Sequence, residues 1–375
     1  MPSPNGGGAQ GGSPPLGAGP SGGSPTGGSA AGGSAAGGSA AGGSAAGGEG
    51  GVSLPDNPDP TCVADLTLPS GTVEDIAADI GLPGPIVLSG NDLYFTEYLQ
   101  GGPSYLSRIP KKGGVVERVA TAETYAAEIA ISNDAVFWGN WDELDQVTPV
   151  GSVGRLALAD DSTTVALADL GQPHGMAFHA GDLYVTDTVA VELLALRANG
   201  ATDLLPLPAP SVPYLVAVDD GGIYVAAIEP GFAPNLISVF HLDRDGNGST
   251  IYTLDPAVGN LTSITLDGDW LYLMTDAGIV MRGTRDGGPL KTLAYVQNPI
   301  TAAVVRDCFV YFTSSRVSGA VARVPVQGGE VQDLANAVKP QGIAVDDDTI
   351  YWTSKASTGP LDPPPTTGFL RRRAK

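Results

Sequence analysis

Short apolar segments alternate with tight polar turns from residue 61 to the end of the chain. The clearest unit is Gln341–Ser354, which reads QGIAVDDDTIYWTS and joins an apolar run, a polar turn and an aromatic-centred segment. Such short, turn-bounded segments predict half-buried β-strands. The aromatic residue recurs about every 43 residues, at Tyr94, Phe137, Tyr184, Tyr224, Tyr272, Tyr311 and Tyr351. That spacing is typical of a four-stranded propeller blade, so the pattern predicts seven blades.

The two ends of this region predict how the ring closes. The seventh unit stops at Gly368–Lys375, which corresponds to a third strand, so its fourth strand is missing. A matching strand stands at the other end, because Thr72–Ile80 aligns with Glu330–Val338, the fourth strand of the sixth unit. We expect the N-terminal strand to complete the last blade, which removes two exposed sheet edges. The predicted fold is an all-β, seven-bladed propeller over residues 61–375.

The first sixty residues have a different composition. Residues 1–51 are almost entirely Gly, Ser, Ala and Pro, with repeated GGSAA units. Such a segment buries too little apolar surface to offset the entropy lost on ordering. We therefore assign residues 1–60 as a disordered tether, with an end-to-end distance on the order of 40 Å.

Charge and cysteine content narrow the classes of partner. Lys and Arg number 19 and Asp and Glu number 40, which gives a net charge of −21. A chain this acidic is not expected to bind nucleic acid or anionic lipid. No apolar run approaches the roughly 18 to 20 residues of a membrane span, and no signal peptide is visible in this chain. We expect a monomer without a cofactor.

Cys62 and Cys308 are the two cysteines, and they match no metal-binding pattern. They could form a disulfide that pins the N-terminal arm to the propeller, or they could be two buried thiols. One further segment resembles a metal-binding motif, although a hairpin turn is the favoured interpretation. Asp243, Asp245 and Asn247 resemble the start of a calcium loop, but its twelfth position is Leu254 and the segment falls where a hairpin turn is expected, so no metal is assigned.

Four of the aromatic segments resemble a known superfamily. They read YFTE (Tyr94–Glu97), YVTD (Tyr184–Asp187), YFTS (Tyr311–Ser314) and YWTS (Tyr351–Ser354). Over about residues 71–375 the chain resembles the YWTD, NHL and TolB-like propellers, although the YWTD type has six blades. The resemblance implies the fold but indicates very little about function. The tether is similar to those of bacterial envelope lipoproteins, which implies an extracytoplasmic location, in the cell envelope or secreted.

A site is expected on one face of the ring. The longer, irregular connections all fall on the face that carries the second-to-third-strand loops, where a rigid scaffold usually presents its function. Residues just before each first strand should ring the axial opening, and the polar candidates for ligand binding are Glu128, His174, Tyr214, Thr262, Thr301 and Gln341. On the outer loops, Tyr98, Trp141 and Phe232 are candidate partner contacts.

These features favour a non-catalytic binding or scaffold propeller that takes a protein or small ligand at its loop-rich face. The alternative is an enzyme, because Pro173–Ala177 (PHGMA) is similar to a phrase in seven-bladed lactone-opening lyases of the virginiamycin B lyase type. That resemblance implies a metal-dependent lyase or lactone-acting enzyme, with Glu128 and His174 close together at the opening. Those enzymes need further His and Glu residues at the opening, whereas the seventh unit here carries Gln341. A third hypothesis is that the protein is a purely structural adhesion or surface-layer component.

Overall fold

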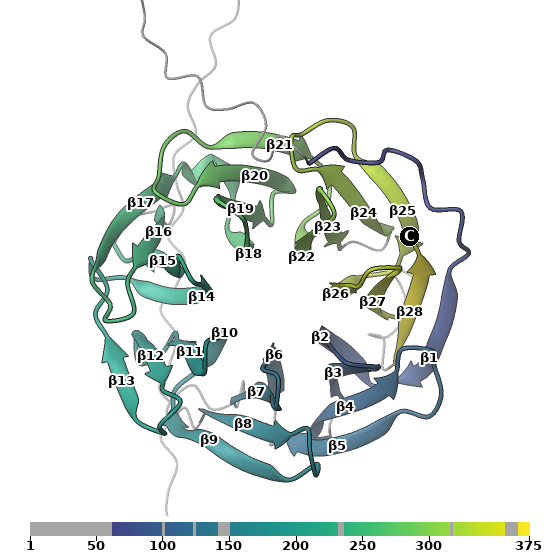
Figure 1. Cartoon of the computed structure of the whole chain (residues 1–375), viewed down its shortest axis with the longest axis horizontal. Helices are drawn as coiled ribbons and strands as arrows, with labels where there is room; N and C mark the ends of the chain where they lie inside the picture. The colour runs from purple at the N-terminus through teal and green to yellow at the C-terminus, as the bar shows by residue number, and fades with distance from the viewer. Residues whose placement is uncertain are drawn as a thin grey trace, which may run out of the picture. The chain divides into compact units, whose positions relative to one another are not determined.

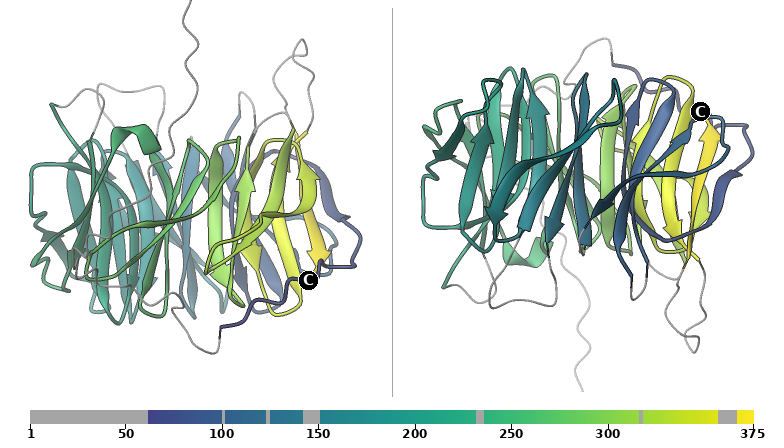
Figure 2. Two further views of the ribbon diagram at one scale, coloured as in Figure 1. Left: turned by 90° about the horizontal axis from the view of Figure 1, so that it is seen from above. Right: turned by 90° about the horizontal axis from the view of Figure 1, so that it is seen from below.

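The computed structural model describes residues 62–375 apart from 100–101, 123–124, 142–150, 232–235, 316–317 and 357–366, so the predicted tether lies outside the described residues. Within them, 28 strands form seven four-stranded antiparallel sheets. Figure 1 shows these sheets as blades around one central axis, and Figure 2 shows the same ring from two sides. The predicted all-β, seven-bladed propeller is therefore confirmed. One helical turn, η1 (Pro256–Val258), is described, and no described helix has the length and apolar character of a membrane span.

The strands occupy four positions from the axis outward, and blades 1 to 7 are taken in chain order. The innermost strands are β2 (Leu82–Ser89), β6 (Tyr125–Ile131), β10 (Pro173–His179), β14 (Val212–Asp219), β18 (Leu261–Asp267), β22 (Ile300–Arg306) and β26 (Pro340–Val345). The second strands are β3 (Asp92–Tyr98), β7 (Ala135–Trp141), β11 (Asp182–Asp187), β15 (Gly222–Glu229), β19 (Trp270–Thr275), β23 (Phe309–Ser314) and β27 (Thr349–Lys355). The third strands are β4 (Ser104–Pro110), β8 (Gly151–Ala157), β12 (Glu192–Leu196), β16 (Leu236–Leu242), β20 (Ile279–Thr284), β24 (Gly319–Pro325) and β28 (Gly368–Ala374). The outermost strands are β5 (Glu117–Ala122), β9 (Thr163–Leu170), β13 (Thr202–Leu205), β17 (Gly248–Leu254), β21 (Lys291–Tyr295), β25 (Gln332–Ala337) and, for blade 7, β1 (Glu74–Ile80).

Ring closure follows the predicted scheme. β1 pairs antiparallel with β28, and Ala77 lies opposite Leu370 in the register. The strand begins at Glu74 rather than at the predicted Thr72, and residues 62–73 form an extended arm before it. In Figure 1 this arm, drawn in purple, runs around the outside of β25 to reach β1.

The aromatic anchors build the packing between blades. All seven lie in the second strands and are buried, with Tyr184, Tyr224 and Tyr272 wholly so. Tyr184, for example, belongs to a hydrophobic cluster that also contains Ile223 and Val225 of the next blade. Each buried aromatic ring removes a large apolar area from water and so helps to hold neighbouring sheets together.

Arginines on several third strands join their blade to the next one. Arg282 Nη1 donates to Val326 O at 2.7 Å, and Arg372 Nη1 donates to Lys111 O at 2.9 Å. In both cases the acceptor lies in the hairpin between the third and fourth strands of the following blade. Arg323 faces blade 7, where no hairpin exists because β28 and β1 come from opposite ends of the described chain.

The arm supplies the missing acceptors at that position. Arg323 Nη2 donates to Thr67 O at 2.7 Å and to Asp65 O at 3.2 Å. The start of the arm is joined covalently to blade 6, because Cys62 and Cys308 form a disulfide with a Cα–Cα distance of 5.5 Å. The arm therefore supplies the acceptors that a hairpin supplies in other blades, and the disulfide joins the start of the arm to blade 6.

Candidate functional site

The seven innermost strands meet at an axial opening with a volume of about 240 Å³. Every blade contributes residues from the same level of its innermost strand, so the lining draws on segments that are far apart in sequence. Four of the six predicted polar residues line this opening: Glu128, Thr262, Thr301 and Gln341. His174 and Tyr214 do not line it.

A shared irregularity places these residues at the opening. In each blade the register between the innermost and second strands shifts at the start of the innermost strand, as between Pro173 and Met176 or between Pro340 and Ile343. A bulge of this kind bends the strand and redirects its side chains. The bulge is therefore the local feature that turns residues such as Gln341 toward the axis.

Threonines of the YxT segments hold the bulges in place. Thr353 Oγ1 accepts a hydrogen bond from Gly342 N at 2.9 Å and donates to Gly84 O of the next blade at 2.7 Å. Thr186 Oγ1 accepts from Gly175 N at 2.7 Å in the same manner. The strands approach so closely here that a Cβ on Gly342 would lie 2.9 Å from Gly84 O. The conformation of the opening thus depends on these buried side-chain bonds.

The acidic residue after the threonine has a different structural role. Glu97 accepts from Gly81 N at 2.7 Å, and Asp187 accepts from Gln172 N at 2.9 Å. Both acceptors are buried and bind the crossover that leads into their own blade. The sequence pattern predicted the fold from these residues and did not predict their bonds to the crossover. The available signal was an acidic residue directly after the threonine in YFTE and YVTD.

His174 and Tyr214 join blade 3 to blade 4. His174 Nδ1 donates to Tyr214 O at 2.8 Å, and the two rings meet edge to face with centroids 6.3 Å apart. Burial lowers the pKa of His174 and raises the pKa of Tyr214. The Nδ1 atom of His174 is thus used within the protein, in the contact between blades 3 and 4.

Glu128 is the one ionisable side chain among the residues that line the opening. Burial raises the pKa of Glu128 to about 7. Within the described part of the chain, no hydrogen bond or ion pair joins Glu128 to His174 or to any cation. The carboxyl group is therefore available to a ligand and titrates near neutrality.

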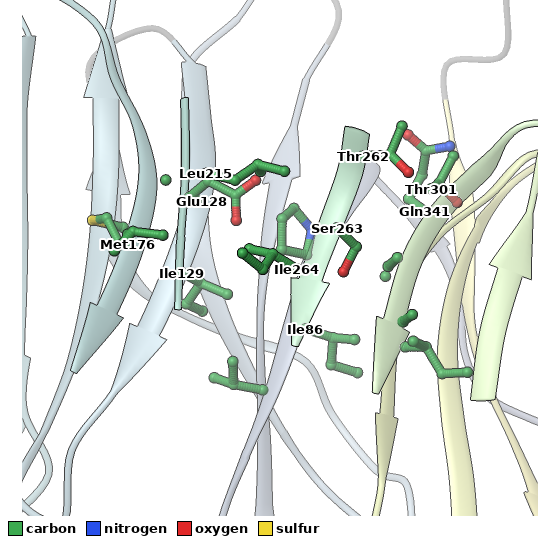
Figure 3. Close-up of a pocket in the computed structure, with 18 residues that line it drawn as sticks. Ile86, Glu128, Ile129, Met176, Leu215, Thr262, Ser263, Ile264, Thr301 and Gln341 are labelled. Atoms are coloured by element: carbon green, nitrogen blue, oxygen red, sulfur yellow. The ribbon is translucent and has the colours of Figure 1, made fainter. Parts of the chain in front are cut away.

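Most of the polar side chains that line the opening lie on blades 5 to 7, and Glu128 lies apart from them. Figure 3 shows Thr262, Ser263, Thr301 and Gln341 together on blades 5 to 7, with Glu128, Leu215 and Met176 on the other side. The backbone of the ring is regular, but the side chains that it presents to the opening differ from blade to blade.

Other predicted residues fall outside this opening. Tyr98 and Trp141 are half-buried and end β3 and β7, respectively, and Phe232 lies outside the described residues. Asp243 closes a hairpin turn, because its Oδ1 accepts from Asp245 N at 2.9 Å and Asn247 N at 2.8 Å. Among the residues that the structure describes, no cluster of three or more His, Cys, Asp or Glu side chains is arranged to hold a metal ion.

No protein-family model and no curated protein sequence matches this chain. Solved structures do match the fold. A streptogramin B lyase superposes with a TM-score of 0.62 at 15% identity, covering 81% of this chain and 98% of the lyase. Virginiamycin B lyase from Staphylococcus aureus gives 0.59 at 14% identity, covering 80% and 99%. A catalytically inactive variant of the latter enzyme with quinupristin gives 0.61 at 15% identity, covering 81% and 99%. At these identities, the likeness shows that the chain shares the propeller fold of those enzymes.

Proposed function

We propose that the protein is a non-catalytic binding propeller that holds a small ligand at the axial opening. The observation that carries this proposal is the opening itself, where Glu128, Thr262, Thr301 and Gln341 converge among apolar side chains. A concave site with a few polar groups in an apolar lining is typical of small-ligand binding. The regular blades serve as a rigid support, and the side chains that differ between blades provide recognition.

Catalysis is the less supported function. General acid–base chemistry needs titratable groups within reach of one substrate. Among the residues that line the opening, Glu128 alone has a titratable side chain. The ring of His174 is bonded to Tyr214 O. Similarity of fold to a lyase does not transfer its chemistry, because function depends on the residues of the site.

An extracytoplasmic location remains part of the proposal. The disulfide between Cys62 and Cys308 supports it, since such bonds persist mainly in oxidising compartments. The Gly/Ser/Ala-rich composition of residues 1–51 suits a spacer between a surface and the propeller.

A variant with a blocked opening tests the binding function. Ala302 lies in the lining on β22, and Ala302→Trp is expected to fill the opening. The control is Val165→Trp on the outer strand β9, where the side chain is 65% exposed. Saturation-transfer NMR with a mixture of small alcohols, amines, amino acids and monosaccharides should detect bound molecules in the wild type and the control. Signals that persist unchanged in Ala302→Trp would refute binding at the opening.

A second assay separates binding from lyase activity. Quinupristin is incubated with the full chain, and its retention is followed by reversed-phase chromatography because opening a ring by elimination leaves the mass unchanged. We expect no change in retention over hours. Conversion that is lost in His174→Ala would establish the enzyme alternative.

A further inference from the structure

We propose that the ligand of the axial opening is a small amphipathic molecule that carries an amine and further hydrogen-bond donors. This inference rests on the proposed binding function and specifies its chemistry. It follows from counting which hydrogen-bonding groups of the opening are already used within the protein and which remain available.

Gln341 offers an acceptor to the opening. Its Nε2 donates both of its hydrogens, to Pro340 O at 2.9 Å and to Lys339 O at 3.1 Å. Both partners are carbonyl oxygens, so the bonded atom must be the amide nitrogen. The remaining Oε1 can only accept. A ligand at blade 7 therefore meets a carbonyl oxygen and needs a donor.

The threonine hydroxyl groups of blades 5 and 6 also donate hydrogen bonds within the protein. Thr262 Oγ1 donates to Met274 O at 3.3 Å, and Thr301 Oγ1 donates to Pro340 O at 3.0 Å. Thr301 Oγ1 also bonds Thr313 Oγ1 at 2.9 Å. A hydroxyl has one hydrogen and two lone pairs, so neither side chain has a second hydrogen to donate, and each retains at least one lone pair as an acceptor. Ser263 differs, because its hydroxyl can either donate or accept. The polar side chains of blades 5 to 7 thus favour a ligand that supplies donors.

Because its carboxyl group can be negatively charged, Glu128 favours a ligand whose hydrogen-bond donor is positively charged. Its carboxyl group lines the opening and has no bonding partner among the described residues. An ionised carboxylate accepts hydrogen bonds only, and those from an ammonium group are among the strongest available in proteins. The neighbouring lining includes Ile129, Met176 and Leu215, which can contact hydrocarbon. An amine on an apolar body satisfies both features.

Three probes with one hydrocarbon body test the inference: aminohexanol, hexanediol and hydroxyhexanoate. They share a terminal hydroxyl and differ only in carrying an amine, a second hydroxyl or a carboxylate. Dissociation constants are measured by NMR titration of the full chain at pH 8 and pH 5. At pH 8 we expect aminohexanol to bind about ten- to a hundredfold more tightly than hexanediol, with hydroxyhexanoate weakest.

Substitution of the carboxyl group completes the test. Because the pKa of Glu128 is about 7, the preference for the amine should fall to within about threefold at pH 5. Glu128→Gln should remove the preference at pH 8, so that aminohexanol binds the variant no more than about threefold more tightly than hexanediol does. Glu330→Gln, at an exposed position in the blade 6 hairpin, removes the same charge elsewhere and should keep the preference.

The outcomes separate this inference from the function on which it rests. Equal binding of the three probes, tightest binding of hydroxyhexanoate, or a preference that survives Glu128→Gln would overturn the amine assignment. Binding would still be placed at the opening if Ala302→Trp abolished it. Probe binding that Ala302→Trp does not affect would overturn both proposals. Absence of binding by all three probes would overturn the ligand class.

Discussion

Loss of the Cys62–Cys308 disulfide should lower the free energy of unfolding by about 3–5 kcal/mol. The bond spans a sequence separation of 246 residues. For a loop of that length the chain-entropy relation gives roughly 5 kcal/mol, and residual structure in the denatured chain reduces this value. The folded arm should stay in place, because Arg323 Nη2 donates to Thr67 O and Gln332 Nε2 donates to Leu66 O at 2.8 Å. Most of the loss therefore arises in the unfolded state.

Urea titration followed by tryptophan fluorescence measures this loss. Cys62→Ser, Cys308→Ser and the double variant should lose the same free energy, because each removes the same cross-link. Wild-type protein treated with a dithiol reductant serves as the matched control and should reproduce the value. A loss below about 1 kcal/mol in the double variant would refute the chain-entropy reasoning. So would a double variant that is destabilised by the sum of the two single effects.

A double-mutant cycle tests whether the disulfide and the arm contacts act separately. Arg323→Met removes the donor to the arm, and Arg282→Met provides a comparison in which the acceptor, Val326 O, belongs to a continuous hairpin. If the disulfide acts on the unfolded chain and Arg323 on the folded one, Arg323→Met and Cys308→Ser should be additive within about 0.5 kcal/mol. A coupling above about 1.5 kcal/mol would instead show that the disulfide positions the arm for Arg323.

Three further substitutions test the site and its frame by urea unfolding. Because burial raises the pKa of Glu128 to about 7, the folded state binds more protons than the unfolded state between about pH 4.5 and 7, and stability falls as pH rises through that range. Glu128→Gln should therefore stabilise the protein by about 1–3 kcal/mol at pH 8 and leave it unchanged at pH 4; parallel pH profiles would contradict this. Thr353→Val leaves Gly342 N without its acceptor and should cost about 1–3 kcal/mol, whereas a change below about 0.3 kcal/mol would contradict that bond. Tyr272→Ala empties a wholly buried anchor position and should cost about 3–5 kcal/mol; an unchanged midpoint would contradict its core role.

The fold could be predicted from the sequence repeat, because every blade packs against its neighbours in the same way. A buried aromatic such as Tyr272 must recur once per sheet, and strand β1 could be recognised because its pattern copies β25. Side-chain direction was harder to predict. His174 and Gln341 hold equivalent positions in the sequence repeat, yet only Gln341 lines the opening. The difference lies in a tertiary contact, since His174 finds a carbonyl acceptor at Tyr214 that the repeat pattern does not encode.

The residues that identify the fold and the residues that could bind a ligand are separate sets, and this separation explains how the opening can be specific. The hydroxyl groups of Thr186 and Thr353 form hydrogen bonds with the backbone of the innermost strands. Because these bonds recur, the bulges keep one geometry without any contribution from the side chains that face the axis. Glu128 can consequently remain unbonded at the opening, where burial holds its pKa near 7, at a cost to stability that the surrounding frame must offset. The carboxyl group of Glu128 forms no hydrogen bond or ion pair among the described contacts, so it does not stabilise the fold. A ligand that donates hydrogen bonds to this carboxyl group would recover, on binding, the free energy that its burial costs.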